Sequence, residues 1–142
     1  MVLKAKDIMH TDFMEIEDSL TVAEASRKMV ERRRGYAIVN HEDRPVGMLT
    51  EWDFLEKLVA PGKDASSITV SVIMTSPLVV TDKETPTEEV VELMVQKGIR
   101  RLVVTDAGRV VGVITSRDIL SIFKKYVDEI SSIVARFSAS PF

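Results

Sequence analysis

The sequence has no cysteine among its 142 residues, and only two histidines. Disulfide bonds, thiolate nucleophiles and cysteine-ligated metal sites are therefore excluded. Neither His10 nor His41 has a partner at the spacing of a catalytic triad or a metal site. The sequence also lacks a P-loop and a Gly-x-Gly-x-x-Gly dinucleotide motif. These absences argue against catalysis, and we expect the protein not to be an enzyme.

Long hydrophobic runs are missing as well. No stretch approaches the roughly 18 apolar residues of a membrane span, and the first residues lack the apolar core of a secretory signal. The net charge is −3 and the pI is near 5.5, whereas proteins that bind nucleic acid usually carry a net basic surface. We therefore expect a cytoplasmic protein that needs neither a membrane nor a nucleic acid as partner.

What the sequence does contain is an internal repeat. A shift of 65 residues aligns the chain with itself without a gap and carries Thr50 onto Thr115 and Asp53 onto Asp118. In both copies a glycine and two apolar residues precede the threonine of a Thr-x-x-Asp element. One copy cannot cover its own apolar face, so we expect the two copies to pack together and share a core.

Each copy is predicted to fold in the order β-α-β-β-α. Apolar periodicity, turn residues and helix-capping signals define these elements. In the first copy we expect them at residues 13–15, 21–34, 36–39, 46–49 and from Glu51, and in the second at 78–80, 85–98, 102–104, 110–114 and from Ser116. We assign residues 1–59 to the first motif, 60–70 to a linker, 71–124 to the second motif and 125–142 to a C-terminal helix extension and tail.

The last helix is predicted to be longer than its counterpart in the first copy. Nine apolar residues between Ile119 and Phe137 recur at three- and four-residue spacing. Such a stripe packs either on the protein's own core or on a partner. Because the extra turns have no counterpart in the first copy, we expect a partner surface, most simply in a homodimer.

The repeated motifs resemble a tandem pair of CBS domains, which is called a Bateman module. The resemblance covers roughly residues 3–123. It rests on Lys6–Met9 and Val72–Thr75 ahead of the two copies, and on Gly47–Asp53 and Gly112–Asp118 within them. It implies an α/β (α+β) fold in which two CBS-type β-α-β-β-α units pack with pseudo-twofold symmetry. It also implies two clefts between the units and a tendency of modules to pair.

The ligands implied by this resemblance contain adenosine. We expect AMP, ADP or ATP first, then S-adenosylmethionine or NAD, and no cofactor that the protein requires. A carboxylate accepts the protons of a ribose diol, and a helix N-terminus favours phosphate. Thr115 and Asp118 form the better-equipped element, because Arg100, Arg101 and Arg117 accompany them and arginine suits phosphate.

The first copy is less well equipped. Where the second copy has two arginines it has Gly35 and Tyr36, and Trp52 stands in place of Arg117. Trp52 either stacks on a base or is buried in the core or in a dimer face. The residues of this copy that are expected to contact a ligand are Thr50 and Asp53. Thr75, Ser76 and Pro77 are instead expected to wall the slot for the base at the Thr115–Asp118 element.

Two interpretations of the Thr-x-x-Asp elements remain open. Their spacing is close to that of a capping box, so they cap helices, bind a ligand, or do both. We predict a stand-alone sensor in which a nucleotide shifts the arrangement of the units and an unknown protein partner detects the change. The alternatives are a ligand-free dimerisation or docking scaffold and, less favoured, a protein associated with nucleic acid.

Overall fold

The computed structural model describes residues 2–139. Met1 of the predicted first motif and residues 140–142 of the predicted tail lie outside the described residues. The chain forms two compact units, which we name by the repeat that each contains. The first unit comprises residues 12–79, and the second comprises the residues up to Thr11 together with those from Val80 onward. Each unit therefore includes a segment that precedes the other repeat.

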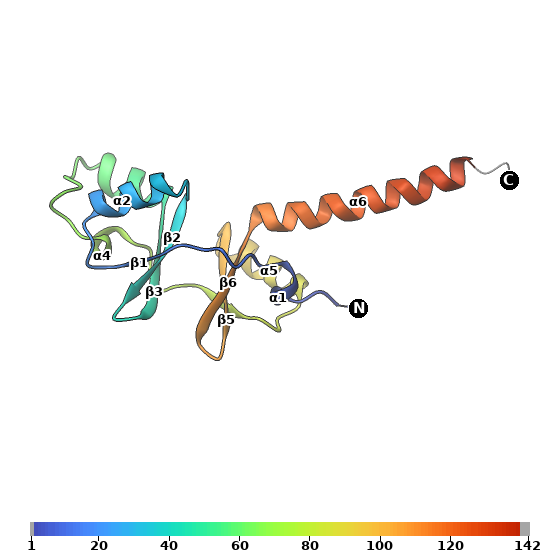
Figure 1. The fold of residues 1–142 in the computed structure, drawn as a ribbon, viewed down its shortest axis with the longest axis horizontal. Coiled ribbons are helices and arrows are strands. Elements are labelled where there is room, and N and C mark those ends of the chain that lie inside the picture. Colours follow the sequence, from blue (N-terminus) through green and yellow to red (C-terminus); the bar gives the residue numbers. More distant parts are fainter. Residues whose placement is uncertain (1, 140–142) are drawn as a thin grey trace. The chain divides into compact units, whose positions relative to one another are not determined.

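The first unit is built on a three-stranded sheet in the order β1-β2-β3 (Figure 1). The strand β1 runs parallel to β2, and β2 pairs with β3 as an antiparallel hairpin. Its elements are β1 (Glu15–Glu17), α2 (Val22–Glu31), β2 (Tyr36–His41), β3 (Arg44–Thr50), α3 (Glu51–Phe54), a π-helical turn η1 (Leu55–Val59) and α4 (Val70–Ile73).

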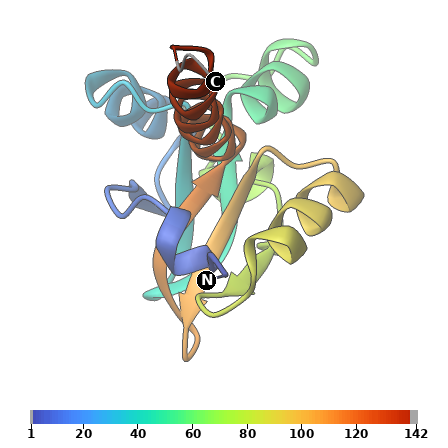
Figure 2. The same cartoon turned by 90° about the vertical axis from the view of Figure 1, so that its right-hand side faces the viewer.

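The second unit repeats this sheet, in the order β4-β5-β6. Its elements are α1 (Ala5–Ile8), β4 (Val80–Asp82), α5 (Thr87–Lys97), β5 (Arg101–Asp106), β6 (Arg109–Thr115) and α6 (Ser116–Ala139). The short helix α1 packs against α5, β6 and the start of α6 (Figure 2). The predicted α/β fold with β-α-β-β-α order is confirmed in each unit.

The predicted positions of the first strands were wrong by about two residues. Strand β1 covers Glu15–Glu17 and not residues 13–15, and β4 covers Val80–Asp82 and not residues 78–80. Pairing with the hairpin sets these positions, since Glu15 lies opposite Ile38 and Val80 opposite Val103. Of the apolar residues that suggested the strands, Phe13, Met14, Leu78 and Val79 lead into them, whereas Val80 begins β4.

The helix predicted at residues 21–34 ends earlier, at Glu31. The backbone of Arg33 turns left-handed (φ 53°), and the Arg34 N–H donates to the carbonyl of Met29 at 2.9 Å. This is a Schellman end, which closes a helix by a 6→1 hydrogen bond. At the corresponding position after α5, Gly98 has φ 63°. An arginine therefore occupies a conformation that glycine adopts more readily.

Candidate functional site

A glycine in each repeat lets an extended segment pass close to the sheet. In the second unit, His10 and Val113 exchange two backbone hydrogen bonds of 3.0 Å. A Cβ on Gly112 would clash with the Met9 side chain and lie 2.9 Å from the carbonyl oxygen of His10. Glycine at this position therefore allows the segment before the first repeat to lie on β6.

In the first unit a glycine likewise allows an extended segment to lie close to the sheet. Thr75 and Met48 exchange backbone hydrogen bonds of 2.8 and 2.9 Å, and a Cβ on Gly47 would lie 2.7 Å from the Thr75 carbonyl oxygen. The 65-residue shift carries His10 onto Thr75. In both units this pairing brings one side chain to the aspartate of the Thr-x-x-Asp element.

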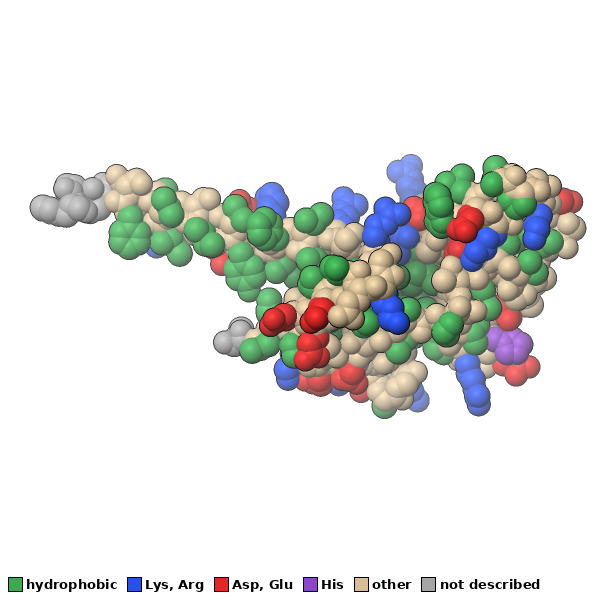
Figure 3. Space-filling view, turned by 180° about the vertical axis from the view of Figure 1, so that it is seen from behind, with side chains coloured by type: hydrophobic (Ala, Val, Ile, Leu, Met, Phe, Trp, Pro, Cys, Tyr) green, Lys and Arg blue, Asp and Glu red, His purple; other side chains and the backbone are tan. Residues whose placement is uncertain are grey.

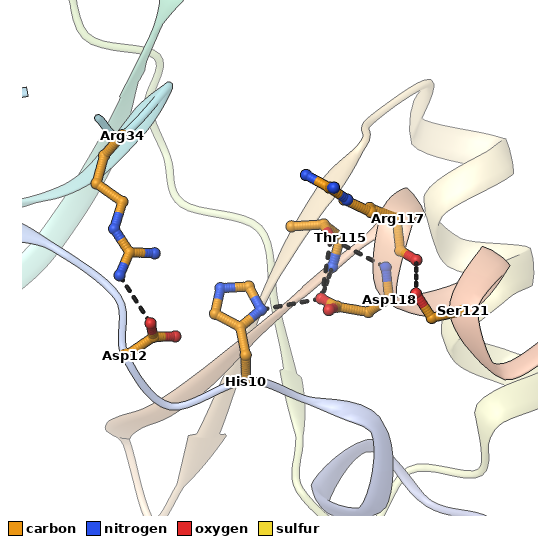
Figure 4. A network of polar contacts seen from close by, with 7 residues as sticks. All are labelled: His10, Asp12, Arg34, Thr115, Arg117, Asp118 and Ser121. Carbon is orange, nitrogen blue, oxygen red and sulfur yellow. Dashed lines mark hydrogen bonds and ion pairs between the residues drawn. The ribbon is translucent and has the colours of Figure 1, made fainter. Parts of the chain in front are cut away.

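The Thr115–Asp118 element stands at the junction of β6 and α6 (Figure 4). The backbone N–H and the hydroxyl of Thr115 donate to Oδ2 of Asp118 at 2.7 and 2.9 Å. The Asp118 N–H in turn points to the Thr115 hydroxyl oxygen at 3.2 Å. This reciprocal arrangement is a capping box, so the element stabilises the start of α6. Capping does not exclude the binding role, because it uses only one oxygen of the carboxylate.

His10 makes the third contact to that oxygen. Its Nδ1 lies 2.9 Å from Oδ2 of Asp118, and each of the two side chains is about one quarter exposed, at 24% and 25%. Within residues 2–139, the hydrogen bonds to this carboxylate all end on Oδ2. Oδ1 accepts no hydrogen bond from these described residues. His10 did not enter the set of residues predicted from sequence, although the repeat aligns it with Thr75.

The three predicted arginines gather at the same end of the sheet. Arg101 begins β5 and lies opposite Thr115 in the strand register. The carbonyl of Arg100 accepts a hydrogen bond of 2.9 Å from the Ser116 N–H. Arg117 follows in the first turn of α6, is exposed, and extends beside Thr115 (Figure 4). The structure thus brings together the five second-unit residues that the sequence pointed to.

The corresponding aspartate of the first unit is enclosed. The side chain of Asp53 is only 3% exposed. Its Oδ2 accepts from the N–H of Thr50 at 2.9 Å, and its Oδ1 accepts from the hydroxyl of Thr75 at 2.8 Å and from Lys57 Nζ at 3.0 Å. Lys57 Nζ also donates to the carbonyl of Ile73 at 3.1 Å. Both oxygens of this carboxylate therefore have partners inside the unit.

Lys57 was not among the residues predicted from sequence. It stands four residues after Asp53 on the same helical segment, at a spacing that brings opposite charges together. The repeat shift carries it onto Ile122, which has no charge. The signal was therefore present in the sequence, as an i, i+4 pair found in one copy only.

Thr75, Ser76 and Pro77 were expected beside Thr115 and Asp118, but they belong to the first unit, where Thr75 contacts Asp53. The remaining predicted residues of the first unit take varied positions. Tyr36 is buried at the start of β2, and the carbonyl of Gly35 accepts from the Glu51 N–H at 3.2 Å. A cis peptide joins Ser76 to Pro77, and both residues are exposed. Trp52 is 61% exposed, so it is not a core residue.

The described residues also limit what else the protein can hold. Between residues 2 and 139, no three histidine, aspartate or glutamate side chains are grouped so that they could hold a metal ion. In the same range, no helix is both long enough and apolar enough to span a bilayer.

The family comparison fits this arrangement of two sheets and two Thr-x-x-Asp elements. The CBS domain family matches residues 5–60 and 69–125. The chain belongs to the CBS domain family. It is a tandem CBS pair, as the resemblance in the sequence implied.

The similar proteins include uncharacterized archaeal proteins and a cyanobacterial protein with a CBS part. An uncharacterized protein of Methanopyrus kandleri is 34% identical over 92% of this chain and 68% of its own length. The crystal structure of an uncharacterized conserved protein from Pyrococcus horikoshii has 31% identity and a TM-score of 0.79, and the match covers 86% of this chain and 92% of that one. A hexameric CBS-CP12 protein from bloom-forming cyanobacteria has 38% identity and a TM-score of 0.76, with 84% and 71% covered.

Enzymes also appear among the relatives, but they share only a module with this chain. The inosine-5'-monophosphate dehydrogenase of Methanocaldococcus jannaschii is 32% identical over 84% of this chain and only 23% of its own length. The matched part is the CBS pair, and most of the enzyme has no counterpart here. The chain is thus a CBS-pair protein of the regulatory or sensor type.

Proposed function

We propose that this CBS pair binds an adenosine-containing ligand at the Thr115–Asp118 element of its second unit and signals its presence to a protein partner. AMP, ADP or ATP is the ligand class we expect first, followed by S-adenosylmethionine. The observation that carries the proposal is the open Oδ1 of Asp118, on a carboxylate that is one quarter exposed and already held in position.

The chemistry of a ribose suits this carboxylate. A carboxylate oxygen offers about two lone-pair sites, so Oδ1 of Asp118 can accept from both hydroxyls of the diol while Oδ2 keeps its contacts with Thr115 and His10. The guanidinium of Arg117 lies in the same turn and supplies a cation for a phosphate. Arg100 and Arg101, at the neighbouring end of β5, supply two more.

The first unit is the poorer site by the same reasoning. A ribose at Asp53 would have to displace Lys57 Nζ or the Thr75 hydroxyl from Oδ1. Displacing the ammonium would leave the buried carboxylate of Asp53 without its cation, which is unfavourable. We therefore infer that a chain takes up one nucleotide through its second unit before any through its first.

Signalling requires that the ligand favour one arrangement of the protein over another. Asp118 lies in the first turn of α6. A ligand bound to Asp118 would therefore contact the N-terminal end of this long helix.

The test is calorimetric titration of the full chain with AMP, ATP, S-adenosylmethionine and NAD. We expect heat and a rise in melting temperature with at least one of them. Asp118→Asn removes the charge but keeps the shape, and should weaken binding more than Asp53→Asn. Equal losses in the two variants would contradict the ranking of the sites, and no binding of any of the four ligands would refute the proposal.

The second candidate function is a ligand-free dimerisation scaffold. The exposed apolar face of α6 favours it, since such faces mark interaction surfaces. Measurements with and without nucleotide distinguish the two candidate functions. A scaffold would assemble equally well with and without every nucleotide tested, and nucleotide would raise the melting temperature of neither the wild type nor the Asp118→Asn variant.

A further inference from the structure

The helix α6 extends far beyond the sheet to which it is attached. Its 24 residues correspond to about 36 Å of helix. Every residue from Phe123 to Ser138 is exposed. Hydrophobic side chains nevertheless gather along one side of it (Figure 3). The exposed apolar residues are Leu120, Phe123, Tyr126, Val127, Ile130, Ile133, Val134 and Phe137.

The spacing of these side chains is the heptad spacing that is typical of helices that pair with other helices. Leu120, Val127 and Val134 lie seven residues apart, and so do Phe123, Ile130 and Phe137. The two series alternate at spacings of three and four, which are the a and d positions of a heptad. Tyr126 and Ile133 add a third row beside them, as in helices that pack in bundles. The pattern is therefore that of a helix which meets another helix along most of its length.

The size of this face suits a stable pair of proteins. Phe123 and Phe137 alone leave 66% and 75% of their surface exposed. Together the eight side chains expose on the order of 900 Å², against about 800 Å² for each partner in a typical specific interface. An apolar face of this extent is seldom left uncovered on a monomer.

The opposite face of α6 argues against a lipid surface as the partner. It carries Lys124 and Lys125 but also Asp128 and Glu129, with an ion pair of 3.2 Å between Lys124 and Asp128. Helices that lie in a membrane interface carry a polar face dominated by lysine and arginine. Mixed charge is instead the usual composition of the solvent face of a paired helix.

We propose that α6 pairs with α6 of a second copy of this chain, through the a and d residues between Leu120 and Phe137. A single stripe on one helix is self-complementary, so two copies related by a twofold axis cover each other's apolar face. The hexameric assembly of the CBS-CP12 protein is in keeping with self-association in this family. The pairing stands independently of the nucleotide site.

The experiment measures the mass of the full chain by light scattering and sedimentation. The wild type should have at least twice the 15.9 kDa of one chain. Ile130→Asp introduces a charge at a d position and should raise the dissociation constant about tenfold or more. The matched control is Ser132→Asp, which adds the same charge on the polar face, where Ser132 lies among side chains of both charges. The control should assemble like the wild type.

A second measurement uses the absence of cysteine. Phe137→Cys and Leu120→Cys each place a single thiol in an otherwise cysteine-free chain. If α6 helices pair, oxidation should cross-link like with like for a parallel pair, or one variant with the other for an antiparallel pair. A monomeric wild type, an assembly that Ile130→Asp leaves intact, or binding to anionic vesicles without self-association would each overturn the proposal.

Discussion

The Lys57 ammonium lies 3.0 Å from Oδ1 of Asp53. This contact distinguishes the two repeats at the aspartate of the Thr-x-x-Asp element, which the sequence singled out in both. In the second unit the equivalent of Lys57 is Ile122, and the carboxylate of Asp118 contacts His10 and keeps one oxygen open. Two copies of the same motif thus place equivalent aspartates, Asp53 and Asp118, in two different environments.

Removal of Lys57 should destabilise the first unit. Lys57→Met leaves the buried Asp53 without its cation, and we expect a loss of about 1–2 kcal/mol in the free energy of unfolding. This is less than for a fully buried pair, because Lys57 is one third exposed. Urea denaturation measures it. The double variant Lys57→Met with Asp53→Asn should regain part of the loss, and equal stability of single and double variants would refute the role of the pair.

His10 should act on ligand binding by orienting Asp118. His10→Ala removes the Nδ1 contact, so we expect nucleotide affinity to fall about three- to tenfold. His10→Thr introduces the residue that the first unit has at this position, where the Thr75 hydroxyl donates to Asp53. Calorimetry should therefore find His10→Thr closer to the wild type. If both variants bind like the wild type, His10 has no positioning role.

The end of α2 should be improved by a glycine. Arg33 holds a left-handed conformation that costs an ordinary residue about 1 kcal/mol. Arg33→Gly should therefore raise the free energy of unfolding by an amount of that order. Gly98→Arg is the reciprocal change at the equivalent position of α5, and should lower it. Chemical denaturation of the two variants gives both values, and changes of equal sign would contradict the explanation.

The pH dependence of stability should reflect Glu84. Hydrogen bonds from the ammonium groups of Lys4 and Lys6 lower the pKa of Glu84 from 4.5 to about 2. A lowered pKa means stability that is fully present above pH 4.5 and is lost as the pH falls toward 2. Glu84→Gln should flatten this part of the profile of melting temperature against pH. Because the three side chains are exposed, high salt should reduce the effect in the wild type as well.

The sequence predicted most of the local structure. Around the two aspartates it predicted the contacts with the threonine of the same Thr-x-x-Asp element, but not the contacts with distant residues. The β-α-β-β-α order, the hairpins and the capping role of Thr115 toward Asp118 depend on residues close together in the chain, where periodicity and caps are informative. Glu42 and Asp43 turn the first hairpin with positive φ angles of 49° and 64°, as its two-residue turn requires.

The contacts that distinguish the two units are not local. His10 meets Asp118 across 108 residues, and Thr75 meets Asp53 across 22. No propensity or spacing rule reports such contacts. The alignment of the two repeats places His10 opposite Thr75. Because the two side chains are of different types, the sequence alone did not indicate that both contact an aspartate. The short strands were misplaced for a similar reason, since pairing with a distant hairpin decides where they lie.

The exchange of segments between the repeats has a consequence for biosynthesis. Residues 2–11 leave the ribosome before β6, the strand on which they dock, which is made about 100 residues later. The first unit is complete once its last segment, up to Val79, has emerged, whereas the second must wait for the strand that receives His10. A gene fragment cut at the repeat boundary would encode neither unit whole. Dissection of this protein should follow its contacts and not its repeats.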